Sequence, residues 1–180
     1  MRGVLRGSHV FVEDIDEARK IYSLGFYGKP LSIEKPKGPD DIKEPLVLSL
    51  IEALYLIEKG YLEVVDEKGE KLTPDQIRSC GKAYEERFDE LYAVYRDLRE
   101  KGFVVRSGIK FGADFAVYTV APGVEHAPYL VIALKYGQSL RPNELLSFGR
   151  VSHSTRKQLV LAIVGPGKVI NYVSFKWVKP

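Results

Sequence analysis

The segment RKQLVLAIV, residues 156–164, decides how the second half of the chain must fold. From Leu159 onward it is an unbroken apolar run, which predicts a buried strand. Lys157 lies two residues before the first apolar side chain, at the N-terminal end of that strand. A lysine in this position would be held by a rigid element, so its ammonium group is a candidate for a fixed role.

The segments around this strand predict a sheet with helices packed on it. Residues 141–156 predict a helix, and the tight turn GPGK at 165–168 leads into a last strand at 169–178. Upstream, three more strands are expected at 103–108, 110–120 and 128–136. A helix from about residue 81 to 101 carries one apolar stripe at helical spacing, made of Tyr84, Phe88, Leu91, Tyr95 and Leu98.

The first 82 residues predict a separate, small mixed α/β unit. Two short strands around a glycine turn are expected at 3–13, then a helix capped by Asp14. Residues 45–59 predict a helix with Pro45 in its first turn, and 61–65 predict a strand. A further helix begins at Thr73. The fold class is therefore α+β, or mixed α/β, with an N-terminal domain at 1–82 and a C-terminal domain at 83–180 that has a central mixed sheet flanked by helices.

Composition excludes several classes of protein. The 180 residues carry a net charge of +3, which suits an anionic partner without requiring one. A single cysteine, Cys80, cannot form an intrachain disulfide and favours a cytoplasmic location. Three scattered histidines and the lack of a long apolar run argue against a structural zinc site, a membrane span and a signal peptide.

A metal-dependent nuclease of the restriction type would need a second acid two residues before a strand lysine. Asp114 could be the first acid, but Ala133 stands two residues before Lys135, where the second metal ligand would be. RNA offers a route without metal, because its 2′-OH can attack the neighbouring phosphate. That reaction needs a base, an acid and a cation, jobs that Tyr, His and Lys can fill.

The residues alone leave ordinary alternatives open for each candidate. Tyr118 could be an aromatic residue at a strand end, and His126 a solvated loop histidine in APGVEHAP. Lys157 could be a surface lysine whose stem packs along apolar neighbours.

Five segments, in the same order, resemble the catalytic subunit of the archaeal tRNA-splicing endonucleases (tRNA-intron lyases) of the crenarchaeal type. The catalytic half of that family is similar to KFGADFAVY (110–118), EHAPYLV (125–131) and GRVSHSTRKQLVLAIV (149–164). LVLSLIEALYLIEKG (46–60) and YEERFDELYAVYRDLREKGFVVRSG (84–108) also resemble segments of the family. The resemblance implies a nuclease that cuts precursor tRNA at a bulge–helix–bulge. It would need no metal or other cofactor, and would leave a 2′,3′-cyclic phosphate and a 5′-OH.

Position by position, the resemblance implies a role for four residues. Tyr118 is the general base, His126 the general acid and Lys157 the cation that stabilises the phosphorane. Arg150, seven residues before Lys157, would grip the flipped bulge base. We expect Lys157 to lower the pKa of Tyr118, because an unperturbed phenol, with a pKa of about 10, is a poor base at neutral pH.

The chain departs from the family pattern at two places. The loop SIEKPKGPDDIKEP (32–45) resembles an insertion of the crenarchaeal branch, and its Lys35, Lys37 and Lys43 could contact RNA phosphates. Alternatively, this loop is simply solvated, its lysines offset by Asp40 and Asp41. The GPGK turn lacks the acidic residues that many members dock into a neighbouring subunit.

We therefore expect a second endonuclease subunit to supply an acidic loop, in a two-plus-two heterotetramer; the alternative is a homo-oligomer. The aromatic last strand could pair across a dimer seam. The alternative function is a non-catalytic structural or RNA-binding subunit of the same assembly. Such a subunit would be expected to have lost members of the Tyr/His/Lys set, and this chain keeps all three.

Overall fold

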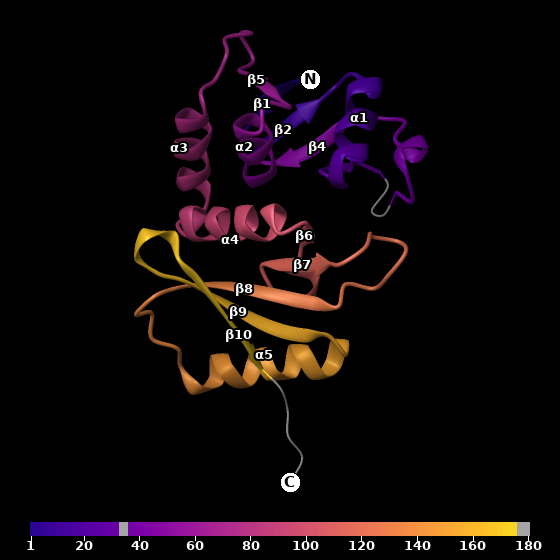
Figure 1. Cartoon of the computed structure of the whole chain (residues 1–180). Helices are drawn as coiled ribbons and strands as arrows, with labels where there is room; N and C mark the ends of the chain where they lie inside the picture. Colours follow the sequence, from indigo (N-terminus) through magenta and orange to yellow (C-terminus); the bar gives the residue numbers. More distant parts are fainter. Residues whose placement is uncertain (33–35, 176–180) are drawn as a thin grey trace. The chain divides into compact units, whose positions relative to one another are not determined.

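The computed structural model of the chain describes residues 1–32 and 36–175, apart from the side chains of Ser152 and Phe175. The chain forms two compact units, Met1–Asp89 (unit 1) and Glu90–Pro180 (unit 2) (Figure 1). Both units contain a mixed sheet and helices, so the predicted α+β, or mixed α/β, class is confirmed. The units divide after Asp89 rather than after residue 82, and the exact domain limit stays a proposal.

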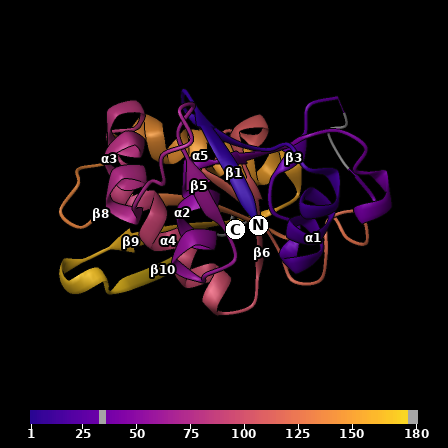
Figure 2. The same cartoon turned by 90° about the horizontal axis from the view of Figure 1, so that it is seen from above.

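Unit 1 is built on a five-stranded sheet with the order β3-β4-β2-β1-β5. Its strands are β1 (Arg2–Arg6), β2 (His9–Val12), β3 (Lys29–Pro30), β4 (Leu46–Ser49) and β5 (Glu63–Val65). Only the β1–β5 pair is parallel among the pairs described. Its helices are α1 (Ile15–Gly25), α2 (Leu50–Glu58) and α3 (Pro74–Tyr84), and α2 lies between the other two (Figures 1 and 2).

The helix predicted at 45–59 is wrong in its first part. Residues 46–49 form strand β4, and α2 begins only at Leu50. The start of α2 is fixed by a capping box, in which Ser49 and Glu52 each bond the other's backbone N–H. Leu46, Val47 and Leu48 are all buried, and a strand that is buried on both faces has the same apolar run as a buried helix. Periodicity therefore could not separate the strand from the helix.

The helix predicted from 81 to 101 is also wrong at its start. α3 continues to Tyr84, the chain is extended at Glu85, and α4 (Phe88–Glu100) is a new helix. Tyr84 consequently does not belong to the apolar stripe, because 63% of it is exposed, whereas the four other predicted members are buried.

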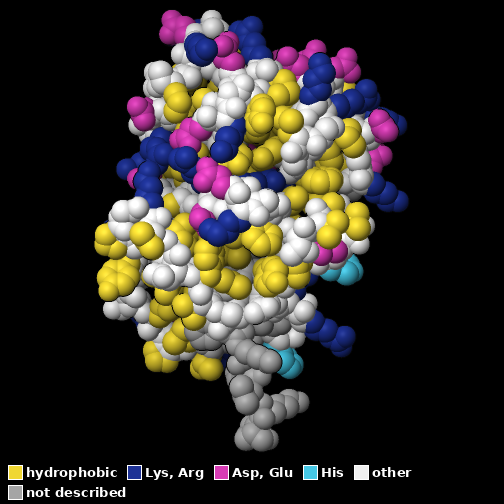
Figure 3. Space-filling view, in the orientation of Figure 1, with side chains coloured by type: hydrophobic (Ala, Val, Ile, Leu, Met, Phe, Trp, Pro, Cys, Tyr) yellow, Lys and Arg dark blue, Asp and Glu magenta, His cyan; other side chains and the backbone are white. Residues whose placement is uncertain are grey.

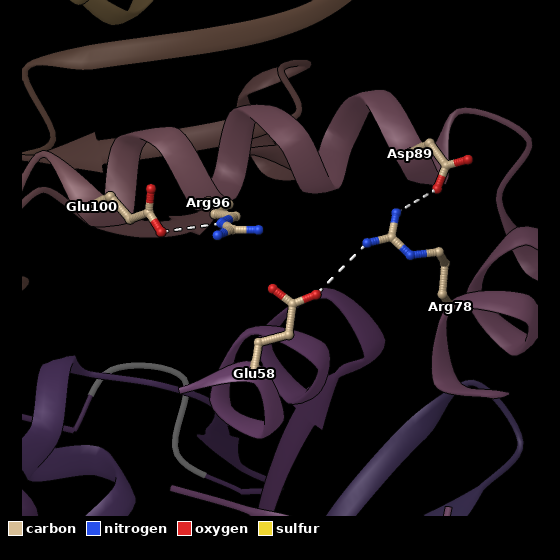
Figure 4. Close-up of polar contacts among 5 residues, drawn as sticks. All are labelled: Glu58, Arg78, Asp89, Arg96 and Glu100. Carbon is tan, nitrogen blue, oxygen red and sulfur yellow. Dashed lines mark hydrogen bonds and ion pairs between the residues drawn. The ribbon is translucent and has the colours of Figure 1, made fainter. Parts of the chain in front are cut away.

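Ion pairs join α3 to α2 and to the start of α4 (Phe88–Glu100), whose first two residues belong to unit 1. Arg78 on α3 contacts Glu58 on α2 at 3.7 Å and Asp89, the second residue of α4, at 2.9 Å (Figure 4). Lys82 adds a second contact to Asp89 at 3.0 Å. Burial works to raise the pKa of the Asp89 carboxyl, but its bonds to Lys82 and Arg78 outweigh burial and lower that pKa.

Unit 2 contains a second five-stranded sheet, with the order β10-β9-β8-β7-β6. Its strands are β6 (Val104–Ser107), β7 (Phe115–Tyr118), β8 (Tyr129–Lys135), β9 (Gln158–Val164) and β10 (Ile170–Phe175). β8 and β9 run parallel and are joined by α5 (Pro142–Thr155), and the other described pairs are antiparallel. The 141–156 helix and the other strands predicted for this unit are confirmed, but the strand predicted at 110–120 begins only at Phe115, because residues 109–111 form a 3-10 helix. Residues 176–178 of the expected last strand lie outside the described residues.

α4 and α5 cover opposite faces of this sheet (Figure 1). On the α4 side, Tyr95 packs against Phe115, and the buried Arg99 donates to the Val105 carbonyl of β6. On the α5 side, Phe148 and Val151 pack on a core of β7, β8 and β9 residues that includes Leu130 and Leu159. None of the helices in the described ranges is long and apolar enough to cross a membrane.

Candidate active site

Three chain segments meet at one edge of the unit 2 sheet, which is formed by the ends of strands and not by an outer strand. β7 ends at Tyr118, β8 begins at Tyr129 and β9 begins at Gln158. The register pairs Val117 with Tyr129, and Tyr129 with Gln158, so the end of β7 and the starts of β8 and β9 are neighbours. The loop 119–128 and the residue before β9 therefore leave the sheet side by side. This edge carries Tyr118, His126 and Lys157.

Tyr118 is half-buried and packs on the core beneath α5. Burial raises the pKa of the Tyr118 phenol above its usual value; the cation that opposes this rise is Arg106, and the nearby Glu125 adds to it. The pKa of Tyr118 is therefore raised, and not lowered as was expected from its cationic neighbours. Arg106 lies on β6 two residues after Val104, the register partner of Tyr118, and so on the same face of the sheet.

His126 projects from the loop between β7 and β8. It is exposed, whereas the next residue, Ala127, is buried in the core. A turn precedes it, in which the N–H groups of Val124 and Glu125 both donate to the Ala121 carbonyl. The buried Ala127 fixes the base of the histidine and leaves the imidazole accessible to a ligand.

Lys157 is not a freely solvated strand-end lysine. Its Nζ donates to the Ala127 carbonyl at 2.8 Å and lies 5.2 Å from the centre of the Phe111 ring. The preceding Arg156 has a left-handed backbone, with φ of 53°, which turns the chain from α5 into β9. The ammonium group is thus held against the residue that follows His126.

These contacts place a phenol, an imidazole and an ammonium group around one short loop. The Lys157 ammonium binds the carbonyl next to His126, and Gln158 N donates to the Pro128 carbonyl at 2.9 Å. Tyr118, Ala127 and Phe111 belong to the same apolar cluster. The edge therefore offers proton-transfer groups of two kinds beside a positive charge, which suits the displacement of an oxygen at a phosphate.

Two family models match consecutive parts of the chain. The model of the tRNA intron endonuclease N-terminal domain matches residues 1–78, and that of the tRNA intron endonuclease catalytic C-terminal domain matches residues 88–172. The chain belongs to the tRNA intron endonuclease family. The "tRNA-splicing endonuclease" of Saccharolobus solfataricus is 57% identical over 180 residues, 99% of each chain, and that of Sulfolobus acidocaldarius is 56% identical over the same shares. The protein of that name from Saccharolobus islandicus is also 56% identical.

The catalytic-domain match of the endonuclease family spans all three edge residues and also Arg150. Arg150 lies exposed on α5, one turn before the helix ends. Its neighbour Val151 packs inward on the core, so Arg150 points away from that contact. The proposed contact of Arg150 with a bulge base stays a prediction.

Lys43 lies exposed in unit 1, at the end of the loop that resembles a crenarchaeal insertion. The loop is anchored to α1, because the Tyr22 hydroxyl donates to the Pro36 carbonyl and Arg19 Nε donates to the Ile42 carbonyl. Lys43 therefore follows a buried residue of fixed position. Lys35 lies outside the described residues, and an RNA contact for this loop stays a prediction.

Three residues near the site were not predicted from the sequence. The pairing of β6 with β7 brings Arg106 close to Tyr118. A short 3-10 helix, Ile109–Phe111, brings Phe111 beside Lys157. Glu125 immediately precedes His126, and its adjacency was the only available signal. Asp114, considered above as a metal ligand, accepts a bond from Ala133 N at 2.8 Å, and the described residues contain no cluster of three His, Cys, Asp or Glu side chains that could hold a metal.

Proposed function

We propose that this chain is the catalytic subunit that cuts introns from precursor tRNA at bulge–helix–bulge motifs, by attack of the RNA 2′-OH and without a metal. Membership of the family makes the chain a tRNA-splicing endonuclease. The observation that carries the finer proposal is the bond from the Lys157 ammonium to the carbonyl beside His126, at the sheet edge where Tyr118 ends β7.

In the proposed reaction, Tyr118 removes the proton of the 2′-OH, whose oxygen attacks the adjacent phosphorus. The bond to the 5′ oxygen breaks, and His126 donates a proton to that oxygen as it leaves. Lys157 stabilises the extra negative charge on the phosphorane. The products are a 2′,3′-cyclic phosphate and a 5′-OH, so atoms and protons balance without a cofactor.

The base role of Tyr118 is compatible with its raised pKa. A phenol of raised pKa is almost entirely protonated at neutral pH, but the small phenolate fraction is a stronger base. Arg106 is the group that keeps this fraction from falling further. We therefore expect the cleavage rate to rise with pH wherever deprotonation of Tyr118 limits the rate.

The substrate would be read by shape rather than by sequence. Bulged nucleotides are unstacked and expose their 2′-OH, so cations at the site can hold them. Figure 3 shows Lys and Arg side chains lying among Asp and Glu side chains on the face in view, so that face is not uniformly basic. Arg150 and Lys43 are the proposed contacts to a base and to a phosphate.

A second endonuclease subunit would complete a two-plus-two heterotetramer; the alternative remains a homo-oligomer. Two features of the chain support a partner. The turn between β9 and β10 contains a 3-10 helix, Pro166–Lys168, with a lysine and no acid. β10 is the edge strand of its sheet, and Tyr172 and Val173 on it are 36% and 43% exposed.

The test uses an end-labelled bulge–helix–bulge RNA in excess EDTA, with the chain alone and with the second subunit. The expected result is cleavage at both bulges with 2′,3′-cyclic phosphate ends. Tyr118→Phe and His126→Ala should each slow cleavage by roughly 10²–10⁴ without weakening RNA binding. Products with 5′-phosphate ends, or activity that appears only when a divalent metal is restored, would overturn the proposal.

A further inference from the structure

The Glu125 carboxylate binds the two residues that follow Tyr118. Its Oε1 accepts the N–H groups of Thr119 and Val120, each at 2.6 Å. The Thr119 hydroxyl donates to both carboxylate oxygens, at 3.0 and 3.1 Å. The Glu125 side chain thus ties the position directly before His126 to the two residues that follow β7.

A carboxylate at this place has an electrostatic cost if the site holds RNA. It would repel a phosphate next to His126 and Lys157. Its oxygens are instead turned toward backbone and hydroxyl donors, and the Val120 N–H is the largest of the causes that lower the pKa of Glu125. The carboxylate therefore stays ionised and bound within the loop under the conditions in which the enzyme would act.

Both neighbours of His126 are anchored to a different member of the proposed triad. Glu125, on one side, is bonded to the two residues after Tyr118. Ala127, on the other side, receives the Lys157 ammonium at its carbonyl. The histidine has no contact of comparable strength of its own in the described residues, so its place depends on these two anchors.

We propose that Glu125 is a positioning residue, whose bonds to Thr119 and Val120 hold His126 at a fixed distance from Tyr118. This inference rests on the proposed function. Glu125 would touch neither the reacting phosphate nor the leaving oxygen. It would act through the placement of the general acid, in addition to the charge by which it raises the pKa of Tyr118.

The primary test compares Glu125→Ala with the unaltered chain, in the complete assembly with a bulge–helix–bulge RNA. Loss of the carboxylate should lower kcat by roughly 10–100-fold, because small misplacements of a catalytic group are costly. KM should stay constant or fall, because a negative charge near the RNA has been removed. Glu125→Gln keeps an acceptor oxygen for the two N–H groups and should restore most of the rate.

A matched control is Glu144→Ala. Glu144 also accepts a backbone N–H at 2.6 Å, from Arg141, but it lies in the first turn of α5, at the end of the helix away from Lys157. This variant should cut at the unaltered rate. A loss of rate in Glu144→Ala as large as in Glu125→Ala would overturn the inference, because a general loss of stability would then explain both.

The decisive measurement is a double-mutant cycle between Glu125 and His126. If Glu125 acts by placing the imidazole, Glu125→Ala should cost less than about threefold once His126 is already Ala. A full, multiplicative loss in the His126→Ala background would overturn the positioning role. If His126→Ala by itself does not slow cleavage, the proposed function fails instead, so the two failures can be told apart.

Discussion

At the scale of single residues, the surroundings of each candidate decide what it can do. Lys157 differs from an ordinary strand-end lysine because the Ala127 carbonyl and the Phe111 ring hold its ammonium group. Tyr118 differs from an ordinary core aromatic because Arg106 lies close enough to oppose the rise of its pKa.

The first prediction concerns Arg106. Arg106→Gln removes the cation that lowers the pKa of Tyr118, so that pKa should rise further and less phenolate should exist at any given pH. The single-turnover rate should therefore fall at each pH below the pKa of Tyr118. Arg96→Gln is the control, because Arg96 pairs with Glu100 on α4 (Figure 4) and should leave the profile in place. An Arg106→Gln profile that coincides with the unaltered one would show that Tyr118 is not the base.

The sequence was sufficient to nominate Tyr118, His126 and Lys157, because their segments resemble the family in order. It was not sufficient to find the group that acts on Tyr118. That group depends on the pairing of β6 with β7, which places Arg106 and Tyr118 on one face. A resemblance carries residues over one by one, whereas a pKa depends on neighbours that only the fold brings together.

At the scale of elements, packing overrides local propensity at two predicted helices. β4 and α2 form one apolar run in the sequence, and the capping box at Ser49 marks where the strand gives way to the helix. Close packing also accounts for the break between α3 and α4. A Cβ added to Gly81, a buried residue of α3, would lie 2.2 Å from the Phe88 ring, so the missing side chain lets the first residue of α4 pack there.

The second prediction concerns Gly81. Helix propensity alone says that Gly81→Ala should stabilise α3 by about 1 kcal/mol. The Phe88 ring reverses this sign, and we expect a loss of about 1–3 kcal/mol in the free energy of unfolding, as for an overpacked core. Ser79→Ala, at an exposed position of the same helix, is the control and should be neutral or slightly stabilising. Denaturant unfolding of both variants checks it, and a stabilised Gly81→Ala would contradict the packing account.

At the scale of the whole molecule, the chain consists of two units, and the proposed roles are spread over both. The two-unit organisation was predictable because the pattern changes from short strands and capped helices to a strand-rich half. The place of the boundary was less predictable, because α4 begins in unit 1 with Phe88 and Asp89 and continues in unit 2. The number of subunits, inferred from the GPGK turn, stays a proposal.

The third prediction concerns assembly. If a partner supplies the acidic loop that the Pro166–Lys168 turn lacks, the chain alone should not form an active tetramer. Sedimentation velocity should show a smaller species for the chain alone and a tetramer after mixing with the second subunit, with cleavage activity appearing together with the tetramer. An active tetramer of this chain alone would contradict the heterotetramer and favour the homo-oligomer.

The most direct test of the central claim is the rate at which His126→Ala cuts an RNA whose scissile 5′ oxygen is replaced by sulfur. A thiolate leaves without a proton, because a thiol has a pKa of about 8.5. The account predicts that His126→Ala cuts this RNA within about tenfold of the unaltered enzyme, whereas Tyr118→Phe stays slow because the 2′-OH still needs a base. If His126→Ala is equally slow on the oxygen and the sulfur substrates, His126 is not the general acid, and the proposed mechanism is contradicted.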